Sequence, residues 1–194
     1  MFNWDSEKDE IISNRMWDET VKRCVQNQLP TVIHGTAGDG VFARLKNLYP
    51  DVQTIFLPSA LQSDLCGISF TECGKIINVP PRWYSGFKEK CKSEPDKIHV
   101  LVFDDGGFTT QEIREISVNI ALNRMIEEKD GGKTWELPNN STVVILSKND
   151  MISIGDNDTR FIHISPDGSV MYKNSTDVLN SNINNEQHKD GKSI

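Results

Sequence analysis

The segment "TVIHGTAGDGVFARL", residues 31–45, constrains the fold of this chain more than any other stretch. A short β-branched run is followed by three glycines at the spacing G-x-x-G-x-G, and a helix-forming stretch comes directly after them. This order is the context that a phosphate-binding loop requires, because glycines let backbone N–H groups approach a phosphate at the positive end of a helix. The segment therefore predicts a strand–loop–helix unit of an α/β protein.

Further apolar runs predict the rest of the sheet. They are "VQTIFLP" at 52–58, "KIHVLVFDD" at 97–105, "TVVILSKND" at 142–150 and "RFIHIS" at 160–165. The nearly continuous run at 97–105 is typical of a strand that is buried on both faces of a parallel sheet. Because helical patterns alternate with these runs, we expect a three-layer α/β domain with a mainly parallel, five-stranded sheet flanked by helices.

The helical patterns are amphipathic. A first helix is expected after the charged opening, with an apolar stripe of Ile12, Trp17, Val21, Cys24 and Val25. A second is expected at 83–91, where Trp83 and Tyr84 are expected to pack, and a third at 109–128, where Thr109 or Thr110 can cap the helix.

Two hairpins are expected outside the sheet. Gly67 and Gly74, followed by the Pro80–Pro81 pair, indicate a hairpin inserted before the second helix, and "DGGKTWELPNNS" at 130–141 indicates the other. We expect a flexible N-terminus at 1–10, one domain at 11–172 and a polar, disordered tail at 173–194, since the tail has too few apolar residues to offset its ordering entropy.

Composition narrows the classes of function. The net charge of −7 disfavours a broad basic surface for nucleic acid, and no apolar run is long enough to predict a membrane span. The four cysteines form no C-x-x-C pair, so reduced thiols are expected and a metal cluster is not. We expect a soluble, cytoplasmic protein, or a virion-associated one if the chain derives from a phage.

The glycine loop keeps one half of a phosphate site and lacks the other half. Gly35, Gly38 and Gly40 retain the backbone cradle. Val41 and Phe42 stand where a phosphate-binding Lys and a Mg²⁺-binding Ser or Thr are needed, so neither the cation nor the metal ligand is present. The loop is interpreted as a vestigial nucleotide site: no cofactor is expected, and ATP with Mg²⁺ would bind only at low affinity.

Polar residues at the ends of other strands extend this site. Asp104 can hold Mg²⁺ through water as in a Walker B motif, whereas Asp105 is one methylene shorter than the Glu that polarises water. The alternative is an ordinary acidic turn after a strand. Asn149 lies near the end of the run at 142–150, at the position where a γ-phosphate sensor would lie. His34 and His99 lie in apolar runs, so we expect them to be packed or hydrogen-bonded rather than catalytic.

Taken in order, the segments resemble the AAA+ ATPase core of the P-loop NTPase superfamily, and more narrowly its MoxR-like and dynein-related branch. The resemblance runs from about Trp17 to Ile164. It is carried by "LPTVIHGTAGDGVFARL", "FLPSALQSDLCGIS", "NVPPRWYSG", "VLVFDDGGFTTQEIREISVNIALNRMI", "WELPNNSTVVILSKND" and "DNDTRFIHI". It implies an AAA+ core in which Arg160 is a candidate to act on a neighbouring subunit's nucleotide; a solvated surface arginine is the alternative.

The chain departs from the family at Val41, Phe42 and Asp105, and it ends where the family continues into a helical lid, so no lid is expected. Our first hypothesis is a pseudo-ATPase that binds protein partners or copies of itself in a larger assembly, with a phage-like particle among the candidates. The alternative is a nucleotide-binding protein or slow ATPase in which Lys46 or Lys75 replaces the missing lysine. A third hypothesis, a nucleic-acid clamp using Lys75 and Lys133, conflicts with the acidic composition.

Overall fold

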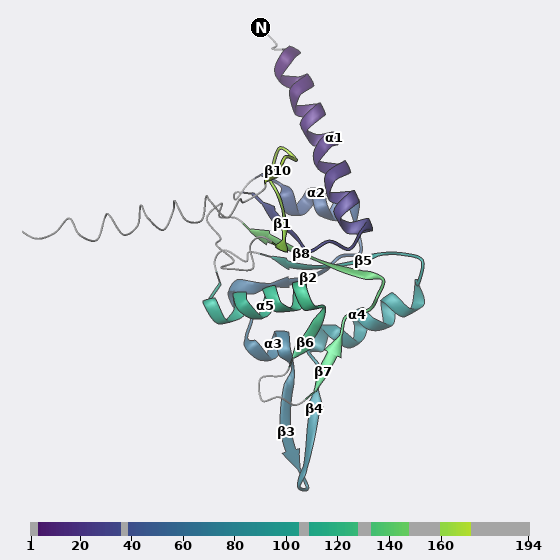
Figure 1. Cartoon of the computed structure of the whole chain (residues 1–194), viewed down its shortest axis with the longest axis vertical. Coiled ribbons are helices and arrows are strands. Elements are labelled where there is room, and N and C mark those ends of the chain that lie inside the picture. The colour runs from purple at the N-terminus through teal and green to yellow at the C-terminus, as the bar shows by residue number, and fades with distance from the viewer. Residues whose placement is uncertain (1–3, 36–38, 105–108, 128–132, 148–159, 172–194) are drawn as a thin grey trace, which may run out of the picture.

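The fold has three layers, with helices on both faces of one central sheet (Figure 1). The computed structural model describes residues 4–35, 39–104, 109–127, 133–147 and 160–171, with side chains from residue 14 onward. In Figure 1, α1 and α2 lie on one side of the sheet, and α3, α4 and α5 lie on the other. Among the described residues, no helix has the length and hydropathy needed to cross a bilayer.

The central sheet has the order β10-β9-β1-β8-β5-β2. Its strands are β1 (Thr31–His34), β2 (Gln53–Phe56), β5 (His99–Asp104), β8 (Ser141–Ser147), β9 (Ile162–Ile164) and β10 (Val170–Met171). The five predicted strands all pair in parallel, and the short β10 adds an antiparallel edge. The predicted fold class, α/β with a mainly parallel five-stranded sheet flanked by helices, is confirmed.

Successive residues of the central strands belong to two different cores. Val32 packs in one core and Ile33 in the other, and β5 alternates in the same way. The first core lies under α4 and α5, and the second lies under α1 and α2. All residues of β1 and β8 are buried, so the apolar residues at their centres do not alternate with exposed polar ones, and the polar residues at their ends are buried too.

The three predicted helices are present, with differences at the N-terminus and at the end of the third. The helix expected at 109–128 stops at Asn123, since Arg124 adopts a left-handed conformation and Met125–Glu127 form a strand, and a short helix at Gln62–Cys66 was not predicted. The helices are α1 (Trp4–Gln26), α2 (Val41–Leu48), α3 (Gln62–Cys66), α4 (Arg82–Ser93) and α5 (Gln111–Asn123). Helix α1 begins at Trp4, within the stretch expected to be flexible, because charged Glu and Lys residues favour helix even where no apolar stripe exists. The hydroxyl of Thr110 accepts a bond from Ile113 N, so Thr110 caps α5.

Two hairpins lie outside the central sheet; the first is where it was predicted, whereas the second begins at Met125, before the predicted segment 130–141, and Ser141 belongs to the central sheet. Strands β3 (Ile68–Glu72) and β4 (Lys75–Val79) form the first, and β6 (Met125–Glu127) and β7 (Thr134–Glu136) form the second. The β3–β4 hairpin projects beyond the body of the molecule in Figure 1. Gly67 joins α3 to this hairpin with φ of 77°, and a Cβ there would lie 2.2 Å from Val79 O. Only glycine fits this junction.

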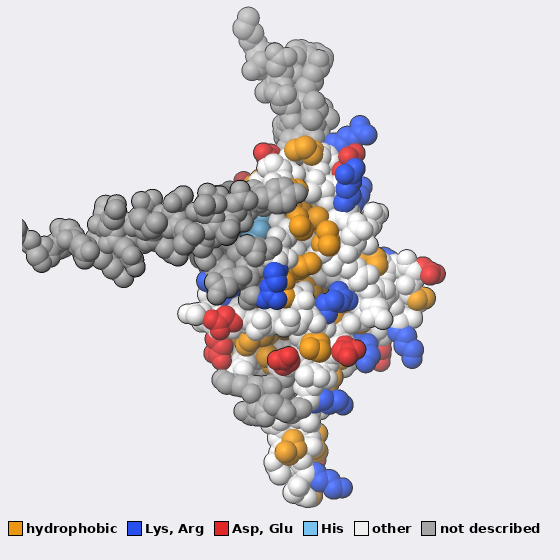
Figure 2. All heavy atoms as spheres, viewed as in Figure 1, with side chains coloured by type: hydrophobic (Ala, Val, Ile, Leu, Met, Phe, Trp, Pro, Cys, Tyr) orange, Lys and Arg blue, Asp and Glu red, His pale blue; other side chains and the backbone are white. Residues whose placement is uncertain are grey.

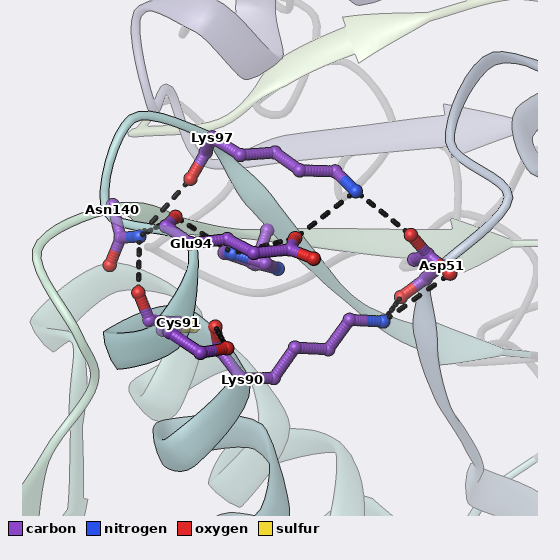
Figure 3. Close-up of polar contacts among 8 residues, drawn as sticks. Asp51, Lys90, Cys91, Glu94, Lys97 and Asn140 are labelled. Atoms are coloured by element: carbon purple, nitrogen blue, oxygen red, sulfur yellow. Dashed lines mark hydrogen bonds and ion pairs between the residues drawn. The ribbon is translucent and has the colours of Figure 1, made fainter.

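A polar network ties the amino-terminal edge of the sheet together (Figure 3). The Asn140 side-chain amide donates to the carbonyls of Cys91, Glu94 and Lys97 at 2.9, 3.1 and 3.1 Å. Lys97 Nζ also lies 2.8 Å from Asp51 Oδ2, and Lys90 Nζ lies 3.5 Å from Asp51 Oδ1. The network therefore joins the end of α4 to the turn before β2 and to the starts of β5 and β8.

All four cysteines are free thiols. Cys24, Cys66 and Cys91 are buried, and Cys73 is exposed in the β3–β4 turn. Burial raises the pKa of Cys91 to about 11, so this thiol stays protonated at neutral pH.

Substituting Gly67 by Ala should destabilise the fold by roughly 2–4 kcal/mol, since the new methyl group adds a backbone clash to a left-handed conformation. The matched control is Gly86→Ala in the exposed face of α4, where a Cβ has open space and φ is not positive. The control should stabilise the protein by ~0.5–1 kcal/mol. Urea denaturation measures both values, and similar effects for the two variants would contradict the packing at Gly67.

Asp51 should make the stability of the protein depend on pH. Hydrogen bonding from Lys97, together with the charges of Lys90 and Lys97, lowers the pKa of Asp51 below its ordinary value of 3.8. A lowered folded-state pKa stabilises the fold above the unfolded-state pKa, and the contribution disappears as pH falls through the folded-state value. Wild type should therefore exceed Asp51→Asn in thermal stability at pH 7 and lose that advantage in acid. A pH-independent difference would show that the charge of Asp51 is irrelevant.

Candidate functional site

The glycine loop lies between β1 and α2, at the carboxyl-terminal edge of the sheet. Gly35 N donates to Ser147 O at 2.9 Å, so the start of the loop is tied to the end of β8. Gly40 has φ of 65° and immediately precedes Val41, the first residue of α2. Thr36, Ala37 and the predicted cradle residue Gly38 lie outside the described residues. The described parts of the loop keep the strand-to-helix geometry that the sequence predicted.

Val41 occupies the position of the missing lysine and is part of the core. Its side chain is 9% exposed and packs with the cluster beneath α1 and α2. A Cβ built on Gly35 would lie 2.7 Å from Val41 Cγ2, so the valine lies directly against the first glycine of the loop. The residue that should reach toward phosphate is instead an apolar contact between α2 and the start of the loop.

Phe42 occupies the position of the metal-binding hydroxyl. Its ring is partly buried and packs against the same core. Lys46 Nζ lies 5.8 Å from the centre of this ring, one turn farther along α2. Helical side chains lean toward the helix N-terminus, so the ammonium group is directed toward the first turn of α2.

The first turn of α2 has features that suit an anion. Gly40 has no side chain with which to cap the helix, and the first turn contains no acidic residue. The first N–H groups of any α-helix have no intrahelical acceptor and carry partial positive charge. The carboxylate of Asp39, directly before Gly40, lies near the start of the same loop, 3.7 Å from a Cβ built on Gly35, so the positive end of α2 has a negative side chain close by.

The carboxyl ends of neighbouring parallel strands bring other predicted residues to this edge. Asp104 ends β5 and is partly buried, with Phe56 of β2 as its register partner. Ser147 ends β8 opposite His34 of β1. Asp105 and Asn149 lie outside the described residues. Within the described part of the chain, no group of three or more His, Cys, Asp or Glu side chains is arranged to bind a metal.

Arg160 lies just before β9, at the strand adjacent to β1. The arginine is exposed, whereas the following Phe161 is buried. Because β9 runs parallel to β1 with Ile162 opposite Thr31, Arg160 lies at the amino-terminal edge of the sheet, whereas the glycine loop lies at the carboxyl-terminal edge of the same chain. Its predicted action on a neighbouring subunit stays a prediction.

A buried histidine pair adjoins the loop, and sequence reasoning did not find it as a pair. His34 Nε2 lies 2.8 Å from His163 Nδ1, and the two rings stack with centroids 5.1 Å apart. One ring nitrogen must donate and the other must accept, so the accepting nitrogen carries no proton. The expectation that His34 is packed or hydrogen-bonded is confirmed. The same holds for His99, which is 3% exposed and whose Nε2 lies 3.3 Å from Glu94 O.

Lys46 and Lys75, the two lysines considered as replacements for the missing lysine of the glycine loop, lie in different parts of the fold. Lys75 begins β4 at the far end of the projecting hairpin, away from α2 (Figure 1). The interpretation of Lys75 as a replacement phosphate ligand is therefore wrong, because a hairpin inserted after α3 carries it away from the loop. Lys46, one turn along α2, is close to the first turn.

Comparison with solved structures identifies the fold. NtrX from Brucella abortus, in complex with ADP, superposes with a TM-score of 0.50 at 13% identity, covering 80% of this chain and 36% of that one. A candidate ATPase from Cytophaga hutchinsonii superposes with a TM-score of 0.44 at 14% identity, covering 91% of this chain and 57% of that one. The fold is of the AAA+ ATPase type.

At these identities the likeness shows the fold alone, and the chain spans 57% and 36% of the lengths of these two neighbours. No protein-family model and no curated protein matches the chain. The predicted resemblance to an AAA+ core is thus confirmed at the level of fold.

The contact between Val41 and Gly35 can be tested by a double-mutant cycle. Gly35→Ala should cost ~1–3 kcal/mol, because the new methyl group overlaps Val41 Cγ2. Val41→Ala removes the overlapping atoms, so the double variant should be more stable than the sum of the two single effects by about 1 kcal/mol. Urea denaturation of the four proteins measures this coupling. Strict additivity would mean that the two residues are not in contact.

Proposed function

We propose that this chain is a pseudo-ATPase: an AAA+-type domain that does not turn over ATP efficiently and acts as a binding or structural subunit of a larger assembly. The observation that carries the proposal is the packing of Val41 against Gly35. An AAA+ loop without its lysine cannot offset phosphate charge with a side chain at that position. In this chain the side chain at that position, Val41, packs in the hydrophobic core instead.

The loss of binding can be estimated from the two missing contacts. A charge-assisted hydrogen bond contributes on the order of 1.5–3 kcal/mol. Losing the lysine and the metal-binding hydroxyl should therefore weaken ATP·Mg²⁺ binding by roughly a hundredfold or more, at ~1.4 kcal/mol per tenfold. Phe42 adds a ring that packs on the core where a hydroxyl would hold the metal.

If the domain does not turn over ATP, its function must come from binding other molecules on its surface. Both cores and the capped α5 are built from the chain's own side chains, and β1 and β8 are buried along their whole length. We infer that this stable framework presents surfaces to protein partners or to copies of itself. Nucleic acid is a poorer partner, because the chain carries a net charge of −7.

A second candidate function is nucleotide binding or slow hydrolysis with Lys46 as the substitute cation. The observation that favours it is the position of Lys46 Nζ over Phe42, toward the uncapped first turn of α2. Asp104, at the end of β5, would be the residue that holds Mg²⁺. In this case Lys46→Ala should abolish binding and Asp104→Asn should abolish magnesium-dependent phosphate release.

Restoring the missing groups should restore nucleotide binding. We expect wild type to give no saturating heat with millimolar ATP and Mg²⁺, and the variant Val41→Lys with Phe42→Thr to bind at least a hundredfold more tightly. Isothermal titration with ATP and with ADP measures both, and Lys92→Ala on α4 is a control for nonspecific charge effects. Saturation of wild type at micromolar ATP would reject the pseudo-ATPase and favour the second candidate.

The assembly half of the proposal has its own test. Wild-type protein should sediment as more than a monomer, alone or with a partner from its native extract. A protein that stays monomeric and captures nothing from that extract would contradict the role as a subunit.

A further inference from the structure

The β3–β4 hairpin is amphipathic. Successive side chains of a strand alternate between its two faces, and residues directly opposite each other in an antiparallel pair share a face. The register therefore places six side chains on one face, which we call the apolar face: Ile68, Phe70 and Glu72 of β3, and Lys75, Ile77 and Val79 of β4. The opposite face carries Ser69, Thr71, Ile76 and Asn78.

The apolar face is exposed in the described part of the chain. Ile68, Phe70 and Val79 are 49%, 45% and 39% exposed, and no residue of the hairpin belongs to either hydrophobic core of the described residues. The hairpin projects beyond the body, and in Figure 2 apolar side chains reach the surface of this projection. Exposed apolar residues gathered on one element indicate an interaction surface, whereas scattered ones do not.

The opposite face is suited to water. The Ser69 hydroxyl donates to Asn78 Oδ1 across the two strands, and Thr71 is also polar. Ile76 is the one large apolar residue on this face. A two-stranded hairpin gains stability when its apolar side is covered by further structure. The apolar face is therefore the one that calls for a partner.

Two charged residues end the apolar face at the tip of the hairpin. Glu72 and Lys75 are directly opposite each other in the register, yet neither forms an ion pair with any described residue. The face therefore carries one anion and one cation side by side, with no net charge. A partner that covers it must offer a cation to Glu72 and an anion to Lys75, because burying a charge without a partner is costly.

A second copy of the same face meets this requirement. When two hairpins pack face to face about a two-fold axis parallel to their strands, β3 of one copy lies over β4 of the other, and the two tips lie side by side. The Glu72 side chain of each copy then lies over Lys75 of the other copy. By the same operation Phe70 lies over Ile77. Every group of the face therefore meets a complementary group.

Other ways of covering the face leave its charges without partners. A two-fold axis across the strands would place each tip over the base of the other hairpin, where Ile68 and Val79 lie. Glu72 and Lys75 would then be covered by apolar side chains. A purely apolar partner, such as a hydrophobic helix, has the same defect. The charges at the tip therefore select a second copy with its hairpin in the parallel orientation.

We propose that two copies of this chain associate through the apolar faces of their β3–β4 hairpins, in a two-fold dimer with parallel hairpins. The contact is isologous, because each copy contributes the same surface, so association closes at two copies. The inference rests on the proposed role as an assembly subunit, and it names the partner as a second copy.

The dimer should be weak, because the face is small. Five-residue strands are about 17 Å long and ~5 Å apart, so the face is far smaller than the ~800 Å² per partner of a standard interface. Dimerisation should also become weaker as salt is added, since the charges at the tip are exposed to solvent before they pair.

Aspartate substitutions on the two faces test which face is used. Phe70→Asp and Ile77→Asp should each weaken dimerisation at least tenfold, because each places a carboxylate in the apolar contact. Thr71→Asp is the matched control: it adds the same charge to the same hairpin on the opposite face, and it should leave the dimer unchanged. Sedimentation velocity at protein concentrations up to millimolar measures the dimer, and thermal melts establish that each variant is folded. Equal effects of Thr71→Asp and Phe70→Asp would overturn the proposal.

Charge variants test the orientation of the two hairpins. Glu72→Lys and Lys75→Glu should each weaken dimerisation about tenfold at low salt, because two attractive pairs become repulsive. The double variant, in which the two charges are exchanged, should dimerise like wild type. An equimolar mixture of the two single variants should form a mixed dimer. Single variants that dimerise as well as wild type would overturn the parallel orientation.

Cys73 gives an independent measurement of the orientation. It is the exposed cysteine among the four, and it lies in the turn at the tip. Parallel hairpins bring the two Cys73 thiols together, so a short bis-maleimide should join two wild-type chains. Cys73→Ser should not be joined, and Phe70→Asp, which keeps Cys73, should be joined at least tenfold more slowly. Equal rates for Phe70→Asp and wild type would mean that the tips meet only by chance collision, against the proposal.

The outcomes separate this inference from the proposed function. A multimer that Phe70→Asp leaves intact would overturn the hairpin dimer and keep the assembly role. A wild-type protein that stays monomeric at every concentration, without crosslinks, would overturn the hairpin dimer and leave the assembly role to a different protein partner. The nucleotide titration tests the pseudo-ATPase separately, because no residue of the hairpin belongs to the glycine loop.

Discussion

Burial of the central strands on both faces is the constraint from which the other features of this protein follow. Val32 and Ile33 are successive residues of β1, yet they pack in different cores. A strand of this kind needs helices on both sides, and parallel strands need long crossover connections, so helices cover both faces. The same crossovers bring the carboxyl ends of β1, β5 and β8 to one edge. The glycine loop and Asp104 lie there for that reason.

At this edge the described residues around the glycine loop form packing contacts. Gly40 retains a left-handed conformation before α2, and Gly35 is held by Ser147 O. Val41 fills the space against Gly35, and the histidine pair joins β1 to β9 beneath it. These contacts hold the strand, the described ends of the loop and the helix together.

The β3–β4 hairpin, in contrast, extends away from both cores. It leaves the body at Gly67, and two isolated strands have little stability of their own without further packing. Four of its large apolar side chains, Ile68, Phe70, Ile76 and Val79, remain exposed.

The sequence by itself determined the features that depend on neighbouring residues. The five parallel strands and the cap and turn at Thr110 and Gly74 can be predicted locally, because periodicity and turn chemistry act over a few residues. The start of α1 was missed because charged residues form helix without an apolar stripe. Only the tertiary structure decided that His34 meets His163, that Val41 contacts Gly35 and that Lys75 is remote from the loop. Those relations depend on strand order and on the path of the inserted hairpin, which bring together or separate residues by long-range packing that no local pattern encodes.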